Sequence, residues 1–337
     1  MTEIRPTASD VHIGGQTISV SMLGTWWQCP RLWYWRYRHT SPTGELGLEP
    51  LHTASPLVIG SAVHLGLAAY YLSGKEGDWQ LEAALSAARQ MFDERSSEFE
   101  SEERWAADLA ETERILRGYV AEYGAEGRSP EWPNFRPIAV EQTYAVLLRT
   151  GDTLSVRPDM LAENFGMLVA VEHKVPGAAR ISPTIGAAAL GAQGLAQAAI
   201  LRYHDVPNNG MLLNIAVRGD YRRDNGRYTS PSKPFQRHVI PVDSTLLVPY
   251  ILDLAAESVL QIRHAVQHWN TLRDDGMSDT EAAHRCFPMA GLFSGQCFKG
   301  WSPCDMANLC KASGREAAQL VNYRVLSYKP ETTTNEE

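Results

Sequence analysis

The chain has 337 residues, of which 44% are hydrophobic and 21% are charged, and its formal net charge at pH 7 is −8. This length and apolar fraction can bury a large core, either as one big domain or as two small ones. The negative charge argues against a general electrostatic binder of nucleic acid, although bound metal and local basic patches can offset it.

Apolar runs, the first ten residues and the number of cysteines indicate the compartment in which the protein is expected. No run of eighteen apolar residues is present, so we expect no membrane partner. Residues 1–10 lack the basic and apolar regions of a signal peptide, and we therefore expect a cytoplasmic protein. The five cysteines are an odd count, which in a reducing compartment favours metal ligation or free thiols over disulfides.

Residues 21–38 form an aromatic segment around Cys29-Pro30. The six aromatic side chains are too many for one helix face, so we expect them to be packed on several sides. Residues 11–44 also contain three arginines (Arg31, Arg36 and Arg38) and no acid. These arginines fit either the solvated side of a core helix or a patch that meets DNA phosphates beside a cysteine ligand.

A helix is predicted to begin at Ser55-Pro56, with the serine as N-cap and the proline in the first turn. It continues through residues 57–65, where Gly60 and His64 lie on one face because they are four residues apart. A lone histidine in an apolar helix is more often a core residue than a ligand, so this pattern alone leaves the role of His64 open.

Residues 79–123 predict two helices. Nine acids between Phe92 and Glu113 are most simply a solvated helical face, which we do not expect to meet DNA. After a proline-broken connector over residues 130–137, the alternation of residues 138–148 predicts one strand, with Glu141 near its start.

A hairpin is predicted over residues 156–175, which carry Pro158-Asp159, twelve further residues, and then Glu172-His173-Lys174. Apolar runs on both sides of residues 163–166 indicate two strands, with a positive φ at Gly166 in the turn. Asp159 is then opposite the end of the second strand, and Glu172 and Lys174 leave the same face.

Two carboxylates and an ammonium therefore meet at one end of this hairpin. Carboxylate oxygens are the ligands that Mg²⁺ or Mn²⁺ needs, and a nearby lysine can orient a water or offset phosphate charge. The alternative is an exposed Glu–Lys ion pair, which is worth little. The apolar run over residues 168–171 favours a buried strand, and charges at the end of a buried strand need a reason.

The chain beyond the hairpin continues the alternation of helices and strands. Alanine-rich residues 186–204 predict a helix with Gln193 and Gln197 on one face. Strands are expected over residues 211–217 and 235–242. The segment between them, residues 218–237, carries five arginines and one lysine against two acids, and either sweeps over a substrate or is a solvated basic loop. Helices over residues 246–272 and 278–285 follow.

Three of the five cysteines, Cys297, Cys304 and Cys310, fall within fourteen residues. Glycines and a proline between them allow the tight turns with which the thiols could converge on one ion or cluster. Buried free thiols are the simpler alternative, and zinc is another, although zinc sites usually use paired Cys-x-x-Cys turns, which are absent here. Cys286 is left over and is expected to be structural.

The Pro-Asp…Glu-x-Lys pattern resembles the signature of the PD-(D/E)XK nuclease superfamily, and the order of motifs over residues 21–310 resembles its RecB-like branch. The resemblance implies that Mg²⁺ or Mn²⁺ is held by His64, Asp159, Glu172 and the backbone carbonyl of His173. It also implies that Lys174 orients the attacking water.

The resemblance extends to the helix that follows the Glu-x-Lys strand. There it implies that Gln193 positions water or phosphate. Gln197 occupies the place where this branch commonly has tyrosine, so the choice between the two glutamines stays open. Glu141 is implied to be a structural or accessory residue.

Cys29 together with the C-terminal triplet resembles the iron–sulfur site of bacterial and phage RecB-like exonucleases, including the CRISPR-associated ones. The resemblance implies a [4Fe–4S] cluster held by Cys29, Cys297, Cys304 and Cys310, since soft thiolates suit such a cluster. It also favours the interpretation of the arginine-rich segment as a patch that meets DNA.

We therefore predict an α/β fold in which helices flank a small mixed central sheet, as in a restriction-endonuclease-like core. Residues 1–337 are expected to form a single nuclease domain. Its parts are a helical N-terminal region over residues 21–130, the core over 136–242, C-terminal helices with the cysteines over 243–313, and a tail over 314–337.

The predicted activity is that of a metal-dependent DNA exonuclease, acting on single strands or duplex ends in recombination, repair or phage DNA processing. One alternative is a CRISPR-adaptation-type nuclease that trims DNA. Another is a non-cleaving iron–sulfur DNA-binding subunit, against which the full Asp, Glu and Lys set argues. Because no Walker or helicase motif is present, unwinding would need a partner such as a helicase, and a strand-annealing protein is a further candidate partner.

Overall fold

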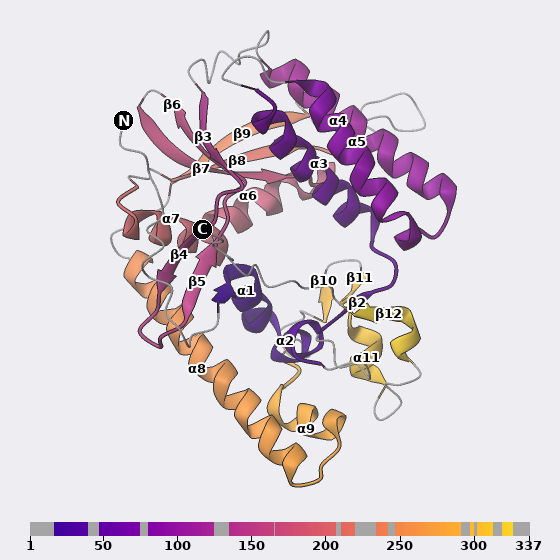
Figure 1. Ribbon diagram of the computed structural model, residues 1–337, viewed down its shortest axis with the longest axis vertical. Coiled ribbons are helices and arrows are strands. Elements are labelled where there is room, and N and C mark those ends of the chain that lie inside the picture. Colours follow the sequence, from indigo (N-terminus) through magenta and orange to yellow (C-terminus); the bar gives the residue numbers. More distant parts are fainter. Residues whose placement is uncertain are drawn as a thin grey trace, which may run out of the picture. The chain divides into compact units, whose positions relative to one another are not determined.

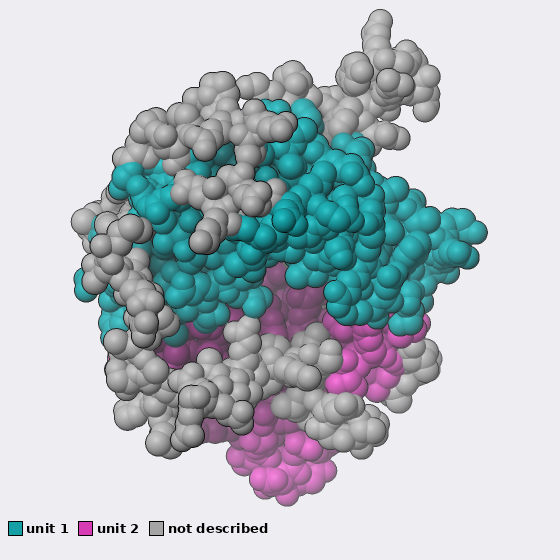
Figure 2. All heavy atoms as spheres, turned by 45° about the horizontal axis from the view of Figure 1, so that its top comes forward, with its two compact units in different colours: residues 1–6, 52–145, 156–251 teal, residues 7–51, 146–155, 252–337 magenta. Residues whose placement is uncertain are grey.

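The computed structural model describes residues 17–39, 47–74, 80–124, 135–164, 166–206, 210–219, 234–241, 247–290, 297–299, 302–312 and 319–325. The chain divides into two compact units (Figures 1 and 2). Unit 1 comprises Met1–Pro6, His52–Ala145 and Val156–Ile251, and unit 2 comprises Thr7–Leu51, Val146–Ser155 and Leu252–Glu337. The assignment of the whole chain to a single nuclease domain stays a prediction.

Unit 1 is built on a five-stranded sheet in the order β3-β6-β7-β8-β9. These strands are β3 (Arg136–Val140), β6 (Met160–Asn164), β7 (Met167–Lys174), β8 (Met211–Ala216) and β9 (Phe235–Ile240). Neighbours are antiparallel except for β7 and β8, which are parallel. The prediction of an α/β fold with a mixed sheet and flanking helices is confirmed at this level.

The β6–β7 hairpin forms as the apolar pattern predicts. Met160 pairs with Val171 and Asn164 with Met167, and Gly166 in the turn has a φ of 77°, a conformation that glycine adopts without strain. This register places Asp159, which directly precedes β6, beside Glu172 near the end of β7.

The parallel pairing of β7 with β8 requires a crossover connection. Helices α6 (Ile181–Leu190) and α7 (Ala192–Tyr203) provide it. The single helix predicted over residues 186–204 is wrong, because the chain leaves the helical conformation at Gly191, where ψ is 138°.

Helices α6 and α7 lie on one face of this sheet. The opposite face is covered by three helices: α3 (Ser55–Leu72), α4 (Leu81–Glu94) and α5 (Glu102–Tyr123) (Figure 1). Side chains alternate along a strand, so Val169 and Val171 of β7 join the core under α3, α4 and α5. On β8, Leu213 and Ile215 belong to a second core with residues of α6. Glu172 and Lys174 therefore leave the sheet on the face opposite to Val171.

The start of α3 differs in detail from the prediction. Its N-cap is Ala54, whereas Ser55 is already helical, and the Ser55 hydroxyl accepts a hydrogen bond from Arg104 Nε at 3.0 Å. By length and apolar composition α3 could cross a membrane, and so could α6 and α7 if their bent pair is counted as one span. In this structure α3 supplies Val63 and Leu67 to the core of unit 1.

The acidic stretch of α4 and α5 is not a fully solvated face. Glu98 is 5% exposed, and its carboxylate accepts hydrogen bonds from Arg95 and from the Thr53 hydroxyl. Asp108 is also buried. The prediction of a solvated face is therefore wrong for these two acids; Glu98 is bound by Thr53, which lies 45 residues away and which the charge pattern does not reveal.

The strand predicted over residues 138–148 is two strands that belong to different sheets. β3 ends at Val140, and β4 (Tyr144–Leu147) pairs in a three-stranded sheet of order β1-β5-β4 with β1 (Thr17–Ser19) and β5 (Thr153–Val156). Glu141, between them, has a φ of 52°, which is incompatible with continuing a strand.

Unit 2 is mainly helical. It contains α1 (Val20–Gln28), α2 (Pro30–Tyr37), most of α8 (Leu247–Asp274), α9 (Asp279–Cys286) and α11 (Ala307–Lys311), with the short pairs β2 (Leu48–Pro50) to β12 (Tyr323–Val325) and β10 (Phe298–Lys299) to β11 (Ser302–Pro303). Its core is aromatic: Phe287 stacks on Trp33 and on Tyr34, with ring centroids 6.0 and 5.1 Å apart. The prediction of packing on several sides is confirmed.

Of the three arginines of the aromatic segment, Arg31 is too deeply buried to belong to a DNA-facing patch, and such a patch stays a prediction for the other two. Arg31 is 1% exposed, and its Nε donates to the carbonyl oxygen of Phe287 at 2.8 Å. Arg36 pairs with Asp305 at 2.8 Å, and the guanidinium of Arg38 lies 5.2 Å from the ring centroid of Trp269. The aromatic core therefore uses Arg31 internally, whereas the Arg36–Asp305 ion pair lies at the surface.

Gly118 on α5 offers a test of this packing. A Cβ atom there would come within 2.6 Å of Phe235 Cζ on β9, whereas a Cβ at Gly186 on α6 would meet no atom within 4 Å. Both substitutions to alanine gain similar helix propensity, so their difference isolates the clash. We expect Gly118→Ala to be less stable to urea than Gly186→Ala by about 1–3 kcal/mol. Equal unfolding midpoints and slopes would contradict the close approach of α5 to β9.

Candidate active site

Asp159 joins two elements of unit 1 at the end of the hairpin. Its Oδ1 lies 3.1 Å from His64 Nδ1 on α3, and its Oδ2 accepts the backbone N–H of His173 on β7 at 2.6 Å. Burial raises the pKa of Asp159, but the hydrogen bond and charge of His64 outweigh burial and hold this pKa below its ordinary value. Burial lowers the pKa of His64, whereas Asp159 and then Glu172 raise it, and the net shift is upward. The pair therefore favours a carboxylate facing an imidazolium.

Glu172 is buried at 3% exposure, and its carboxylate accepts three hydrogen bonds. Oε1 accepts from Lys174 Nζ at 2.6 Å and from Gln193 Nε2 at 2.9 Å, and Oε2 accepts from Gln197 Nε2 at 3.2 Å. The structure thus brings both predicted glutamines onto one carboxylate. The Lys174 side chain is 37% exposed, so the ammonium reaches solvent while it remains paired.

A glycine on α7 helps to bring the glutamines to Glu172. A Cβ atom at Gly194 would lie 3.3 Å from Met211 Cε at the start of β8, which is tighter than an ordinary contact. The glycine therefore lets α7 lie close to the sheet. Because α7 covers the face from which Glu172 emerges, amides of α7 spaced four residues apart can both reach its carboxylate.

The His173 side chain points to the other face and is anchored there. Its Nδ1 lies 3.0 Å from Nδ2 of Asn214 on β8, and the same Nδ2 donates to the Tyr119 hydroxyl at 2.6 Å. Burial lowers the pKa of His173 to about 3, so the ring is neutral. The imidazole serves to fix the strand whose N–H holds Asp159. That its backbone carbonyl is a metal ligand stays a prediction.

The Tyr119 hydroxyl extends this network deeper into unit 1. It lies 2.8 Å from the Tyr71 hydroxyl and 3.4 Å from a guanidinium nitrogen of Arg237. The Arg237 guanidinium also stacks on Tyr123, 3.9 Å from its ring centroid. Sequence reasoning missed this network. The one available signal was Asn214 itself, a polar residue inside an apolar strand.

Glu141 lies at the same end of the sheet as Asp159. Its backbone N–H donates to the Asp159 carbonyl oxygen at 3.1 Å, and its carboxylate pairs with Arg157 Nε at 3.1 Å. Burial and then the charge of Asp159 raise the pKa of Glu141. The backbone bond is compatible with a structural role, and the positive φ of Glu141 is a strain often found at functional sites.

These residues fit a divalent cation in their chemistry. Asp159 and Glu172 supply hard oxygen donors, and His64, once it has lost the proton that Asp159 favours, supplies a neutral imidazole; these donors suit Mg²⁺ or Mn²⁺. Asp159 accepts two protein hydrogen bonds and Glu172 three, fewer than the roughly four lone-pair sites of a carboxylate. Within the described residues, however, no group of three or more His, Cys, Asp or Glu side chains is already arranged as ligands of one ion.

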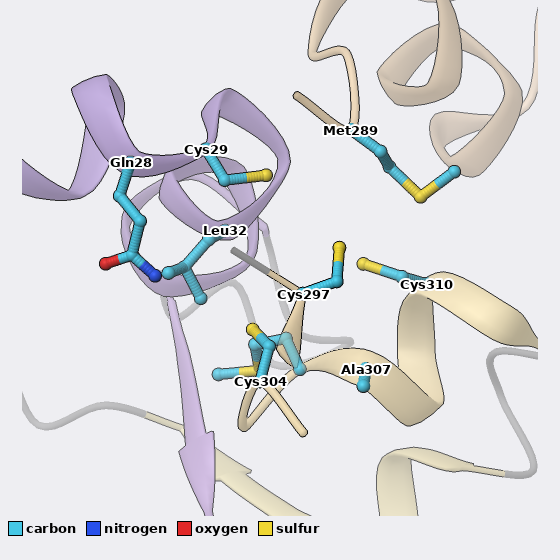
Figure 3. A pocket seen from close by; sticks show the side chains of 9 residues that line it. Gln28, Cys29, Leu32, Met289, Cys297, Cys304, Ala307 and Cys310 are labelled. Carbon is cyan, nitrogen blue, oxygen red and sulfur yellow. The ribbon is translucent and has the colours of Figure 1, made fainter. Parts of the chain in front are cut away.

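The four predicted cluster cysteines lie together in unit 2. Cys29, Cys297, Cys304 and Cys310 line one pocket, with Gln28, Leu32, Met289, Met306 and Ala307 (Figure 3). In the part of the chain that the structure describes, none of them forms a disulfide, and they are not arranged as ligands of an ion. Burial raises the pKa of Cys310 to about 11.

Two further predictions concern neighbouring segments. Cys286 is buried at the end of α9 and does not line this pocket, in keeping with its expected separate role. The centre of the predicted basic loop, residues 220–233, lies outside the described residues.

Comparison with known protein families gives a match. A family model described as the PD-(D/E)XK nuclease superfamily matches residues 17–215, which is more than half of the chain. The matched range contains Cys29, His64, the hairpin and both glutamines, and ends before Cys297. No curated protein matches the sequence.

Asn214→Leu tests the anchoring of His173. The substitution removes an amide that donates to two buried acceptors, which should cost about 1–3 kcal/mol of unfolding free energy. Urea unfolding in EDTA would measure this loss. Asn322→Leu is the control. Asn322 is exposed, and among the described residues its side-chain amide bonds only the Gln319 carbonyl oxygen, at 3.3 Å, so this variant should stay within about 0.5 kcal/mol of wild type. If both variants unfold like wild type, the Asn214 bonds do not hold this face of β7.

Proposed function

The chain belongs to the PD-(D/E)XK nuclease superfamily, and on that premise we propose that it is a metal-dependent DNA exonuclease. Family membership implies a nucleic-acid substrate and phosphodiester hydrolysis. One observation carries the proposal for this chain: the buried Glu172 carboxylate is 2.6 Å from the Lys174 ammonium, while the neighbouring Asp159 is held by the N–H of His173 at 2.6 Å. Two carboxylates and an ammonium are thus fixed on adjacent strands before any substrate arrives.

Asp159, Glu172, His64 and the backbone carbonyl of His173 would hold Mg²⁺ or Mn²⁺. The bound ion supplies a water of lowered pKa and stabilises charge on the phosphate. The side chains of the site hold the reacting groups in position. Glu172 is fixed by three hydrogen bonds, so its carboxylate needs little reorganisation. Lys174 is partly exposed, so it can donate to a water or a phosphate oxygen while Glu172 keeps it in place.

The substrate and pathway are proposed from the order of motifs along the chain. Their resemblance to the RecB-like branch supports action on single strands or duplex ends, in recombination, repair or phage DNA processing. A helicase or a strand-annealing protein is the proposed partner, because the chain itself has no helicase motif. The overall charge of −8 supports a requirement for metal at the site over general attraction to phosphate.

We further propose a [4Fe–4S] cluster in unit 2. Its support is that four cysteines line one pocket, and that Cys29 is fixed between α1 and α2, whose ends it caps. Thiolates are the donors that iron–sulfur clusters require. Cys29 and Cys297 are 268 residues apart (297 − 29). Closing so long a loop is worth roughly 5 to 6 kcal/mol on the chain-entropy model, so the cluster would act first as a staple.

Cleavage of end-labelled single- and double-stranded DNA tests the proposed activity. In Mg²⁺ or Mn²⁺ we expect wild type to degrade both linear forms or one of them. Asp159→Ala, Glu172→Ala and Lys174→Ala should each lose roughly 10²–10³-fold or more in rate while DNA binding persists. Glu163→Ala is the matched control, because Glu163 lies on the same hairpin at the end remote from the site and pairs with Arg136.

Changing the divalent cation and comparing linear with circular DNA make this experiment more specific. Ca²⁺ is larger and less strict in geometry, so it should occupy the site without supporting cleavage, and EDTA should abolish activity. Closed circular DNA should resist an exonuclease. Near-normal rates in Asp159→Ala would contradict the assignment of the site, and cleavage of circles at the rate of linear DNA would contradict exonuclease action.

Metal analysis tests the cysteine proposal. Protein purified without oxygen should be brown and contain about four irons per chain. Cys310→Ser should lose the iron, melt at a lower temperature and become protease-sensitive around residues 21–38, whereas Cys286→Ser should keep all three properties. One zinc and no iron would exclude the cluster. Full metal content and an unchanged melting temperature in Cys29→Ser would exclude the long-range closure.

A further inference from the structure

Two glutamines of α7 bind the same carboxylate through different oxygens. Gln193 donates to Glu172 Oε1, which Lys174 also occupies, at 2.9 Å. Gln197 donates to Oε2 at 3.2 Å and is the only described residue with a hydrogen bond to that oxygen. Without Gln197 the carboxylate would be held at one oxygen and could turn about its Cγ–Cδ bond.

The surroundings of the two amides differ. Gln193 is exposed, so its amide can exchange Glu172 for a water or a phosphate oxygen. Gln197 is 1% exposed and lies in the buried run of α7 that extends from Ala196 to Leu201. Its amide must present N–H to Glu172, because the carbonyl oxygen would repel a carboxylate. Gln197 is therefore a fixed donor that solvent and substrate do not reach.

Burial of Gln197 carries a cost that its single hydrogen bond does not remove. Its Oε1 is buried and has no hydrogen-bond partner among the residues that the structure describes. An unsatisfied buried acceptor lowers stability, and an apolar side chain of similar size would avoid this loss, although it could not donate to Glu172 Oε2. A residue that breaks a packing rule beside a buried carboxylate points to a role other than stability.

We propose that Gln197 is the positioning residue that fixes the plane of the Glu172 carboxylate for a divalent cation, and that Gln193 is the partner that responds to substrate. This inference rests on the proposed function and divides the work of the two glutamines within it. Gln197 acts through Glu172, since its amide is buried. Gln193 lies on the exposed side, beside the Lys174 ammonium with which it shares Oε1.

The same substitution at both positions separates these roles. Mn²⁺ binding to the full chain is measured by calorimetry without DNA, and kcat and KM are then measured on end-labelled DNA at saturating Mn²⁺. Gln197→Leu should weaken Mn²⁺ binding by about 10–100-fold, the range seen when residues that orient metal ligands are lost. Gln193→Leu should keep the Mn²⁺ affinity and raise KM for DNA or lower kcat.

Two controls guard against unfolding and against a general effect of removing an amide. Gln197→Leu removes one unsatisfied acceptor but leaves Glu172 Oε2 without its donor, so a single cooperative unfolding transition in urea, with the wild-type slope, is the sign that the variant is folded. Gln197→Met, which is unbranched and of similar length, replaces it if the leucine variant does not fold. Gln90→Leu removes an amide that donates to Glu94 at 2.8 Å on the exposed side of α4, and should leave both Mn²⁺ affinity and kinetics unchanged.

The outcomes distinguish this inference from the proposed activity. Wild-type Mn²⁺ affinity in Gln197→Leu overturns the inference while cleavage by the wild type would still support the nuclease proposal. Equal losses of affinity in Gln193→Leu and Gln197→Leu overturn the division of roles. Mn²⁺ binding that depends on Gln197, in a protein that cleaves no DNA, would support the inference and overturn the proposed activity. A wild type that binds no Mn²⁺ overturns both.

Discussion

The register of the β6–β7 hairpin is the constraint on which the candidate site depends. Met160 pairs with Val171, and the turn at Gly166 fixes this pairing. A slip of one residue would send every side chain of β7 to the opposite face, so Glu172 would leave α7. The slip is prevented by packing, because it would also move Val171 out of the core under α3, α4 and α5. The apolar side chains that stabilise the sheet therefore also determine where the charges lie.

The crossover between β7 and β8 serves both faces of β7 at once. Its second helix, α7, lies over the face of Glu172 and provides the two glutamines. The parallel pairing that it makes possible sets Asn214 directly beside His173, where the amide anchors the ring on the other face. The strand–helix–strand unit thus acts on both faces of β7. On one face it holds the Glu172 carboxylate, and on the other it anchors His173, whose backbone N–H binds Asp159.

The parts of this site that sequence predicts are those governed by local geometry. The hairpin follows from alternation around Gly166, and the common face of Gln193 and Gln197 follows from helical spacing. The burial of Arg31 and Glu98, and the network of Asn214 with Tyr119, depend on partners that are distant in sequence, so charge pattern and periodicity could not reveal them. The break at Glu141 was missed because its alternating neighbours resemble one continuous strand.

Two of the side chains that hold the Glu-x-Lys strand each bury a polar atom at a cost. Among the described residues of unit 1, buried atoms without a hydrogen-bond partner include Gln197 Oε1 and Asn214 Oδ1. Each belongs to an amide whose nitrogen holds a residue of the Glu-x-Lys strand, Glu172 in one case and His173 in the other. Apolar residues at positions 197 and 214 would remove these two unpaired oxygens, but they would also remove the bonds to Glu172 and to His173. The Glu-x-Lys strand is therefore held by two amides that each leave one buried oxygen without a partner among the described residues.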